Sequence, residues 1–589
     1  MKKTSNMKIV TGQMFKLLPI QILLAAVGSL NAIVSSIFAS NYVGVEAMGA
    51  VGIYAPIGML ITSISTILVG GCVILCGEYM GKNQRNRMQN IFSLNLVLSL
   101  LISAVFIVLF LLLGSFDLTG FLTRDPAVRP LFNRYLIGQA IGVIPLMLGS
   151  SFAAFLSLEN KAKRSLIASV AYIIANIVLC YVFVQRLRME AFGLALASAL
   201  GMWVFLGVQA PVFLSGKSQM RMRVRDLSWG ESGAIIRIGL PGAASNVYQT
   251  ARGLIVNRLL EFFVGSVGVS AFAGAGSLMG LFWALPAGML AVSRLMISVS
   301  VGEEDRQTLT DVMRVMFRRY LPLQCCLSAL IIVCAVPLTR ILFRDPAEPV
   351  YMMTVWGMRI LPLCMPMSII CMHFTCYGQA SGKQGLVHVL ALLDGVVDVA
   401  VFTALMIRSL GMNSVYAANV LNGVVTTLVI LGYAILKKKG FPRNMEELMV
   451  IPDSFGVPAS ERMDLSVRSV EEVVSISERV QSFCLSKGID GRRAYLAGLS
   501  LEEMAGNIVD HGFTKDSKRH AIDVRVVHKG DDVILRIKDD CVPFDPGMRR
   551  QLDEGGDLSK NIGIRMVFGI ARDVQYQNIL GLNVLTIRI

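Results

Sequence analysis

Two carboxylates, Asp394 and Asp398, stand four residues apart inside a long apolar segment of this 589-residue chain. A helix would place both on one face. A charge at membrane depth costs about 2.5–3.5 kcal/mol or more, so such residues are functional candidates by default. Two close carboxylates also share a proton readily, because like charges raise one of the two pKa values. The spacing favours binding of a proton or a sodium ion, with a salt bridge to Arg359 or Arg294 as the structural alternative.

A second pair with the same spacing, Glu503 and Asn507, lies in the polar final part of the chain. On a helix, both side chains would point toward one pocket. A phosphate-bound Mg²⁺ needs few protein oxygens, because phosphates and waters supply the others. Phosphoryl transfer mainly needs positioning and charge neutralisation, which an Asn–Mg²⁺ contact and a nearby carboxylate could supply. The chain has no Gly-x-x-x-x-Gly-Lys-Ser/Thr loop, so ATP-driven pumping is not expected.

The elements that must position the first pair are membrane helices. Hydrophobic residues make up 54% of the chain and charged residues only 16%, against about 25% charged in soluble proteins. Apolar runs of this kind are long enough to cross roughly 30 Å of hydrocarbon as helices. The sequence predicts twelve spans, at about 16–39, 52–76, 91–114, 133–157, 165–184, 191–214, 236–263, 272–300, 317–342, 351–377, 384–407 and 413–436.

The apolar part is also internally repeated. Matching segments recur at a nearly constant offset: Arg-Asp-Pro-Ala at 124–127 and 344–347, Leu18-Pro19 and Leu240-Pro241, and Gly77-Glu78 and Gly302-Glu303. Self-similarity at a long fixed period sets the architecture of a chain. It predicts two six-helix lobes, residues 1–220 and 221–439, which point the same way because six crossings return the chain to its starting side.

Basic residues predict the orientation of these spans. Lys and Arg concentrate before the first span and after every even one, as in Lys2, Lys3, Lys82, Arg85, Arg87, Lys161, Lys163, Arg221, Arg314, Arg318, Lys437 and Lys438. This bias places both termini in the cytoplasm. It also accounts for much of the net charge of +15, so no nucleic-acid partner is expected.

The composition changes abruptly after Lys439. Residues 440–465 form a Gly/Pro/polar linker, and residues 466–589 have the composition of a soluble α+β domain. Helical spacing marks residues 470–485 and 492–509, and alternation marks strands at 522–527 and 533–537. A further helix is expected after Gly563 and a last strand at 582–589. About 130 residues are enough for an independent core.

The membrane part, about residues 10–438, resembles the multidrug and toxic compound extrusion (MATE) family. The motifs that carry the resemblance are Leu18-Pro19, the glycines at 49 and 52, Gly77-Glu78, Asn176-Ile177-Val178-Leu179 and Gly239-Leu240-Pro241. The family implies two lobes around a central cleft, alternating access, and export of organic cations driven by proton or sodium entry.

Several positions depart from that family. Cys180 stands where many relatives have an Asp, and Gln249 stands where sodium-coupled relatives often have a Glu. The first span has no acid, and its candidates are uncharged polar residues such as Asn31. The candidate ion-coupling and substrate residues are therefore Asp394, Asp398, Asn176, Gln249, Asn31, Arg252 and Arg294. If Arg252 and Arg294 face the cleft, an anionic or zwitterionic cargo is favoured over a cation.

The tail resembles the histidine-kinase/Hsp90-like ATP-binding fold, closest to the anti-sigma-factor serine kinases. The segments that match are 501–511, 539–546 and 561–567, followed by the ending at Asp573 and Tyr576. By resemblance, Asn507 would hold Mg²⁺, Glu503 would orient or activate the attacking hydroxyl, Asp539 would contact the adenine amino group, and Gly563 would adjoin the nucleotide. Cys541 and Asn561 replace glycines of that family, so a degenerate domain kept for docking is the alternative.

These features together predict a secondary exporter of small organic compounds in the bacterial cytoplasmic membrane, coupled to H⁺ or Na⁺. Its tail would be a regulatory module that binds ATP and Mg²⁺. Two alternatives stay open. The chain could be a membrane-tethered signalling protein whose tail acts on an anti-sigma-antagonist-like partner, or it could be a flippase of lipid-linked saccharides.

Overall fold

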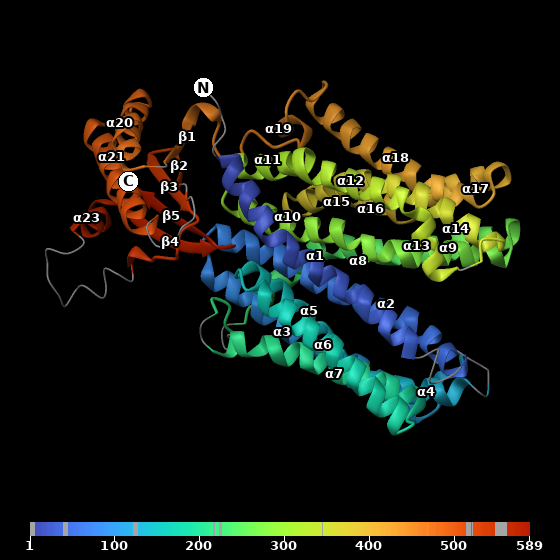
Figure 1. The fold of residues 1–589 in the computed structure, drawn as a ribbon. Coiled ribbons are helices and arrows are strands. Elements are labelled where there is room, and N and C mark those ends of the chain that lie inside the picture. Colours follow the sequence, from blue (N-terminus) through green and yellow to red (C-terminus); the bar gives the residue numbers. More distant parts are fainter. Residues whose placement is uncertain are drawn as a thin grey trace.

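The computed structural model describes residues 6–38, 45–121, 126, 128–215, 218–222, 227–343, 345–467, 469–513, 520, 522–547 and 562–589. A long bundle of helices carries a small sheet domain, the tail, at one end (Figure 1). Helix α1 (Asn6–Phe38) begins at that same end of the bundle.

The first half of the bundle follows the predicted spans closely. Its helices are α1, α2 (Val45–Gly81), α3 (Arg85–Ser115), α4 (Val128–Ala140), α5 (Val143–Leu158), α6 (Ala162–Cys180) with a π turn (Tyr181–Arg186), and α7 (Glu190–Leu214). The second half contains more breaks. Its helices are α8 (Ser232–Phe263), α9 (Ser266–Phe282), α10 (Ala284–Gly302), α11 (Arg306–Val315), α12 (Leu321–Val333), α13 (Ala335–Leu342), α14 (Pro349–Ile360), α15 (Met365–Ala380), α16 (Gln384–Leu392), α17 (Asp398–Leu410) and α18 (Asn413–Lys438).

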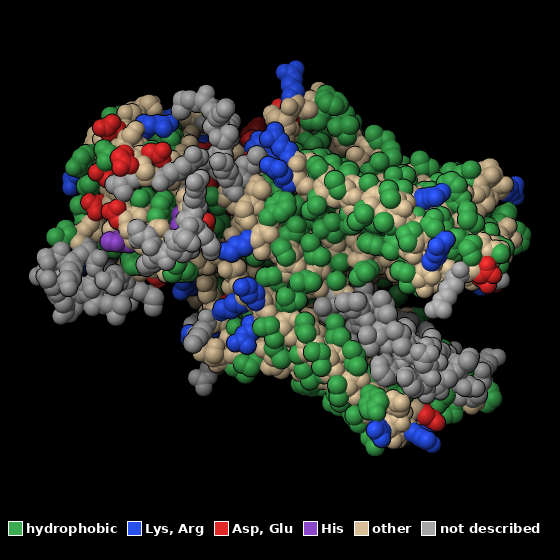
Figure 2. All heavy atoms as spheres, in the orientation of Figure 1, with side chains coloured by type: hydrophobic (Ala, Val, Ile, Leu, Met, Phe, Trp, Pro, Cys, Tyr) green, Lys and Arg blue, Asp and Glu red, His purple; other side chains and the backbone are tan. Residues whose placement is uncertain are grey.

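Ten helical segments of the described chain are long and apolar enough to cross a membrane, and the pair α4–α5, bent by 46°, makes an eleventh. The remaining predicted span is α8, whose polarity is raised by Arg237, Arg252 and Arg258. It nevertheless lies within the bundle, along α2. Figure 2 shows hydrophobic side chains covering the flank of the bundle. The predicted fold class, an α-helical membrane protein followed by a small α+β domain, is confirmed.

The two lobes meet crosswise, as a repeat related by a twofold axis should. Helix α1 packs on α10, and α2 packs on α8. Near the tail the backbones touch: a Cβ on Gly71 would overlap the carbonyl oxygen of Ile235, and one on Gly302 would overlap that of Glu78. Away from the tail the lobes splay apart (Figure 1). The bundle is therefore closed at the tail end.

The tail contains one antiparallel sheet in the order β1-β2-β3-β5-β4. Its strands are β1 (Arg462–Val467), β2 (Ile522–Lys529), β3 (Asp532–Asp539), β4 (Asp573–Ile579) and β5 (Leu582–Arg588). Helices α20 (Val470–Ser486), α21 (Gly491–Asn507) and α23 (Ile562–Ile570) cover one face. Side chains alternate along each strand, so that Val524, Leu535, Ile537 and Ile587 pack beneath these helices. The other face of the sheet carries Arg525, Arg536 and Lys538 and lies toward the bundle.

The segment that joins the two parts is not a free linker. Strand β1 begins within the predicted linker 440–465 and ends at Val467, so the sheet begins before residue 466. Upstream of it, Met449 and Ile451 are buried in the same apolar cluster as the bundle. Arg306 at the start of α11 pairs with Glu446 at 2.9 Å. These contacts hold the joining segment on the bundle.

Candidate functional site

Asp394 and Asp398 lie in the second lobe, at a break in the helix between α16 and α17. Residues Leu393–Val397 form a π turn, a local widening that is frequent at functional sites. The Oδ1 of Asp394 accepts a hydrogen bond from the Asn422 amide at 2.8 Å, and its carbonyl oxygen accepts one from Arg252 at 3.2 Å. Asp398 is 6% exposed, and its Oδ2 has no partner among the described residues. Three helices thus assemble one polar cluster, in which Asp398 and Asn422 are buried and Asp394 and Arg252 are half-buried.

The predicted salt bridges to these aspartates are not present in the described part of the chain. Arg359 instead lies over the Trp356 ring, 5.3 Å from its centroid. Arg294 on α10 keeps a buried Nε without a partner, and no described ion pair joins it to either aspartate. The structural alternative in that form is therefore wrong, and Arg252 is the arginine that the structure places beside the pair.

The other candidates from the sequence lie elsewhere. Asn176 is fully buried on α6, where its Oδ1 is 3.6 Å from the Cys180 thiol, and a π turn follows directly. Gln249 is exposed on α8 and donates to Ser245 at 3.3 Å. The Asn31 side chain lies outside the described side chains. The two halves therefore share a π turn near the candidate residues of spans 5 and 11, but only span 11 carries acids.

Sequence reasoning missed Asn422 on α18. A polar amide in an apolar span is the same signal that singled out Asp394, so it could have been found. It also missed a cavity of about 460 Å³ in the first lobe. Tyr54, Met59, Gln139, Tyr172 and Met202 are among the residues that line it. An apolar and aromatic wall with a few polar groups is typical of sites for small organic molecules.

The tail brings its motif residues together around a cavity of about 440 Å³. Asn507 at the end of α21, Asp539 at the end of β3, and Ile564 next to Gly563 all contribute to the pocket or adjoin it. Tyr576 and Phe544 supply aromatic walls. The volume is within the range of small-molecule and cofactor sites, about 300–1,000 Å³.

Two glycines shape this pocket. A Cβ on Gly563 would overlap the Glu503 carboxylate, so only glycine lets α23 approach α21 this closely. A Cβ on Gly512 would lie 3.1 Å from the Cys541 sulfur. Gly512 therefore makes room for Cys541, which occupies a position where a glycine was expected. Crowding by Cys541 is thus partly relieved. Asn561 lies outside the described residues.

Asp539 is held by a network at the floor of the pocket. Its Oδ1 accepts hydrogen bonds from the Asn583 amide at 2.7 Å and the Cys541 N–H at 2.9 Å. Asn583 in turn accepts from the Tyr576 hydroxyl at 2.8 Å. Burial raises the pKa of Asp539, against the opposing effect of Asn583. Burial also raises the pKa of Tyr576, to about 12, so the tyrosine remains a donor at neutral pH.

Comparison with known families agrees with both parts of the molecule. The family model named MatE matches residues 21–182, and the one for the histidine kinase-like ATPase domain matches residues 467–589. The chain therefore joins a MatE domain to a histidine kinase-like ATPase domain. A search of curated proteins gave no match.

Solved structures extend the likeness to both lobes. One is an outward-facing multidrug resistance MATE family transporter of the MOP superfamily, 19% identical, with a TM-score of 0.66 over 74% of this chain and 100% of that one. A Vibrio cholerae MATE transporter in a mutant form is 18% identical, with a TM-score of 0.66 over 72% and 96%. A MOP superfamily transporter from Pyrococcus furiosus, described as having a binding pocket of reverse polarity, is 19% identical, with a TM-score of 0.65 over 74% and 100%. The membrane part has the MATE fold.

Proposed function

We propose that the protein exports small organic compounds by secondary transport, with entry of H⁺ or Na⁺ at Asp394 and Asp398 as the driving step. The observation that carries this proposal is the polar cluster of these two acids with Arg252 and Asn422. A buried carboxylate oxygen without a partner, such as the Oδ2 of Asp398, is costly unless a cation neutralises it.

The chemistry of the cluster suits a small cation. Besides Asp398 Oδ2, the Oδ1 of Asn422 is also buried and without a partner among the described residues. Carboxylate and amide oxygens are the donors that hard cations prefer. Arg252 supplies one positive charge, so the cluster changes between net negative and neutral as a single cation enters or leaves. That change is what coupling requires, because cation binding must alter the balance between two transporter states.

The cargo would bind in the cavity of the first lobe, where Tyr54, Tyr172 and Met202 offer an adaptable apolar wall. The arginine beside the acids leaves both cationic and zwitterionic cargo compatible with the charge of the bundle. The solved MOP superfamily transporter described as having a binding pocket of reverse polarity supports keeping more than one class of cargo open.

The tail would bind ATP with Mg²⁺ and regulate transport. The residues fit such a group: Asn507 and Asp539 line one pocket, and Gly563 leaves room for the Glu503 carboxylate beside it. Asn507 would hold the metal, Asp539 would accept from the adenine amino group, and Glu503 would orient a hydroxyl. Magnesium-bound ATP supplies the transferable phosphoryl group. Because the sheet is docked on the bundle, regulation is favoured over a signalling role on a separate anti-sigma-type partner.

The protein would lie in a bacterial cytoplasmic membrane with both termini inside. Support comes from the basic side chains that gather near the tail end of the bundle (Figure 2) and from the start of α1 at that end (Figure 1). Protease applied to inside-out and right-side-out vesicles tests this, since the tail should be cut only in the inside-out ones.

Transport is tested in inside-out vesicles with ethidium as the probe and an imposed H⁺ or Na⁺ gradient. Asp394→Asn and Asp398→Asn should each remove ion-driven ethidium uptake. Glu348→Gln, an exposed acid before α14 in the same lobe, serves as control and should leave it unchanged. Unchanged uptake in both aspartate variants would exclude the coupling role.

Nucleotide binding is measured on the full-length protein by titration with Mg-ATP. Asn507→Ala and Asp539→Asn should each weaken binding by about tenfold or more, equivalent to about 1.4 kcal/mol. Asp531→Asn, in an exposed turn of the same sheet, should bind as the unchanged protein does. If the unchanged protein has no measurable affinity for Mg-ATP, the tail is a docking domain only.

A further inference from the structure

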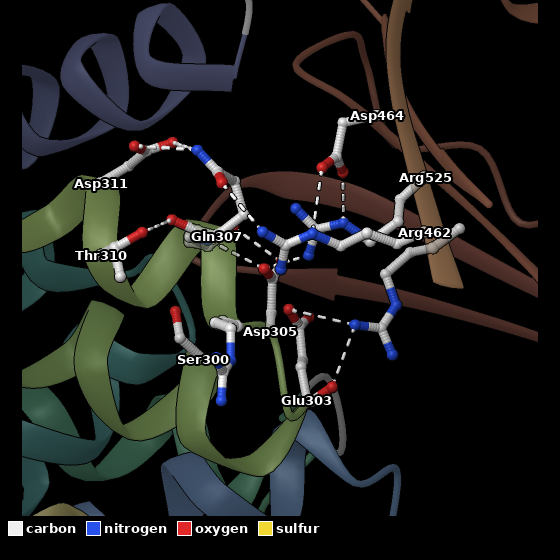
Figure 3. Close-up of polar contacts among 12 residues, drawn as sticks. Ser300, Glu303, Asp305, Gln307, Thr310, Asp311, Arg462, Asp464 and Arg525 are labelled. Atoms are coloured by element: carbon white, nitrogen blue, oxygen red, sulfur yellow. Dashed lines mark hydrogen bonds and ion pairs between the residues drawn. The ribbon is translucent and has the colours of Figure 1, made fainter. Parts of the chain in front are cut away.

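The tail is bound to the second lobe through acids in the loop between α10 and α11. Asp305 pairs with Arg525 of β2 and, at 3.2 Å, with Lys538 of β3. Glu303 pairs with Lys538 at 2.6 Å. Figure 3 shows Arg525 reaching from the sheet between Asp305 and Asp464, with its Nε 2.6 Å from the latter. The basic face of the sheet is therefore matched to an acidic loop.

These contacts are buried. The side chains of Asp305, Glu303 and Arg525 are 1%, 3% and 9% exposed. Burial alone would raise the pKa of Asp305, but Arg525 and Lys538 hold it well below its usual range. Asp305 and Arg525 are thus charged at neutral pH, and their burial leaves the pair poorly screened by salt. Removing one partner of such a cluster would leave the others buried without a counter-charge.

The tail is bound to the first lobe through the turn between β4 and β5. The turn consists of Leu580 (φ 54°) and Gly581 (φ 84°). Leu580 is 2% exposed, and it belongs to the same apolar cluster as Val10 and Met14 of α1. Its carbonyl oxygen accepts a hydrogen bond from the Gln13 amide. One turn of the sheet is therefore inserted against α1 of the first lobe, at the place where α1 packs on α10 of the second.

This turn is shaped for the contact rather than for the tail's own stability. A two-residue hairpin with positive φ at both positions favours Asn-Gly, and a leucine there is strained. Gly581 in turn fits against Asn160 of the first lobe, where a Cβ would overlap the asparagine amide. Strain of this kind persists only where the surroundings compensate for it. Here the compensation is the burial of Leu580 in the transporter.

The docked tail thus holds both lobes at the end where they touch. Gly302, next to the acidic loop, packs on the backbone of Glu78 in the first lobe. To open toward the tail, the lobes must part here. Parting them would strain or break either the contact of Leu580 and Gly581 with the first lobe or the pairing of Asp305 with Arg525, because one five-stranded sheet carries both contacts.

We propose that the tail is a clasp that locks the transporter in the state closed at the tail end. The inference rests on the proposed function, because it requires alternating access of the two lobes. Docking and tail-side opening then oppose one another by the same factor, as linkage demands. Because the clasp is tethered to the bundle, it acts at a high effective concentration and needs no further partner.

The test uses the full-length protein in lipid nanodiscs with fluorescent pairs introduced through unnatural amino acids. A pair at Lys163 and Lys438, exposed on the tail side of the two lobes, reports their separation. A pair at Lys163 and Glu478 reports docking of the tail. The main variant is Leu580→Asn, which gives the tail a better turn sequence but removes the buried apolar anchor. Asp531→Asn, in the exposed β2–β3 turn, is the matched control.

Leu580→Asn should raise the undocked fraction and the tail-open fraction together, each by about tenfold or more, as expected for exposing one buried leucine. Undocking without a change at Lys163 and Lys438 would overturn the clasp, and so would a tail that stays docked. On the other lobe, Lys538→Glu should act in the same direction, and adding Glu303→Lys should restore docking in part. If both separations change as expected but the protein exports no ethidium, the clasp is supported and only the transport assignment is excluded.

Discussion

The loop after α2 and the loop after α10 hold equivalent places in the two halves, yet they behave differently. Each follows a Gly-Glu pair at or near its boundary, Gly77-Glu78 in the last turns of α2 and Gly302-Glu303 at the end of α10. The glycine of each pair packs on the other lobe, as Gly77 does on Ser298 and Gly302 on Glu78. The Glu78 side chain is 23% exposed and pairs with Lys82 one turn along its own helix. The Glu303 side chain is 3% exposed and pairs with Lys538 and Arg536 of the tail.

The residues that follow explain the difference. After Glu78 come Tyr79 and Met80, which are 7% and 4% exposed and pack into the bundle. At the equivalent places after Glu303, the chain has the acids Glu304 and Asp305. The duplication thus places Gly77 and Gly302 at equivalent points of the contact between the lobes, which we call the seam. The two residues that differ, Glu304 and Asp305, make the second-lobe side of the seam a binding surface for the tail. The glycine packing is therefore alike in the two halves, whereas the charge of the residues that follow differs.

The largest effect on docking of the tail is expected from Asp305→Asn, which removes a buried acid found only in the second of the two loops. Asparagine caps a helix as well as aspartate does, so the bond from the Thr308 N–H at 2.8 Å is kept, whereas the charge and the bond that Oδ2 accepts from the Thr308 hydroxyl at 2.7 Å are lost. Leaving Arg525 short of a counter-charge in a buried site should weaken docking by about 3–5 kcal/mol. The ratio of docked to undocked tail, from the pair at Lys163 and Glu478, measures this.

The matched control lies next to it. Glu304 pairs with Lys529 at 2.7 Å, but the two side chains are 46% and 55% exposed. Such surface pairs contribute about 0–1 kcal/mol. Glu304→Gln should therefore change docking little. An equal effect of Glu304→Gln and Asp305→Asn would mean that net charge of the loop, and not burial, binds the tail.

Acidification should act on the same aspartate. Its docked pKa lies below the ordinary value of 3.8 because of Arg525 and Lys538, so the undocked carboxyl takes up its proton first as pH falls. The stabilisation from Asp305 is complete well above pH 3.8 and is lost as pH drops through that value toward the docked pKa. Docking should be constant from pH 8 to pH 6 and weaken below about pH 4. In Asp305→Asn this acid-induced loss should disappear.

The sequence predicts the membrane fold well, because its signal is local. Apolar runs define spans wherever they occur, and the repeated Gly-Glu motif locates the seam. The pair Asp394 and Asp398 also stands out locally. Its neighbours do not, because Arg252 and Asn422 come from helices far away in sequence. The predicted partners, Arg359 or Arg294, form no ion pair with either aspartate among the described residues.

In the tail, the sequence located the pocket residues but not the docking. Asn507 and Asp539 belong to contiguous motifs, and they line one cavity. Leu580 gives no such signal, since a leucine before a glycine is not a hairpin sequence. Its position follows from the apolar wall of α1, which is known only once the tail is placed on the bundle. Strand β1 was missed because its pairing partner β2 begins 55 residues after β1 ends, at Val467 and Ile522.

The glycines of the seam allow a sharper test of its symmetry. A Cβ on Gly302 would overlap the backbone of Glu78, whereas one on Gly77 would overlap the Ser298 side chain. Overpacking of this kind costs about 1–3 kcal/mol. Gly302→Ala should part the lobes at the tail end and lower the Tm. Gly77→Ala should do the same, but Ser298→Gly in the same chain should restore the Tm. If Ser298→Gly also restored the Tm of the Gly302→Ala variant, this assignment of contacts would be contradicted.

The smallest effect is expected on the first loop. Lys82→Met removes the partner of Glu78, whose side chain reaches solvent and can be hydrated instead. An exposed pair one turn apart on a helix contributes about 0.3–0.5 kcal/mol. The Tm and the docked fraction should therefore stay close to those of the unchanged protein, at both low and high salt. A loss of docking as large as that of Asp305→Asn would show that the first loop also binds the tail, and the asymmetry between the two halves would then lie elsewhere than in their acids.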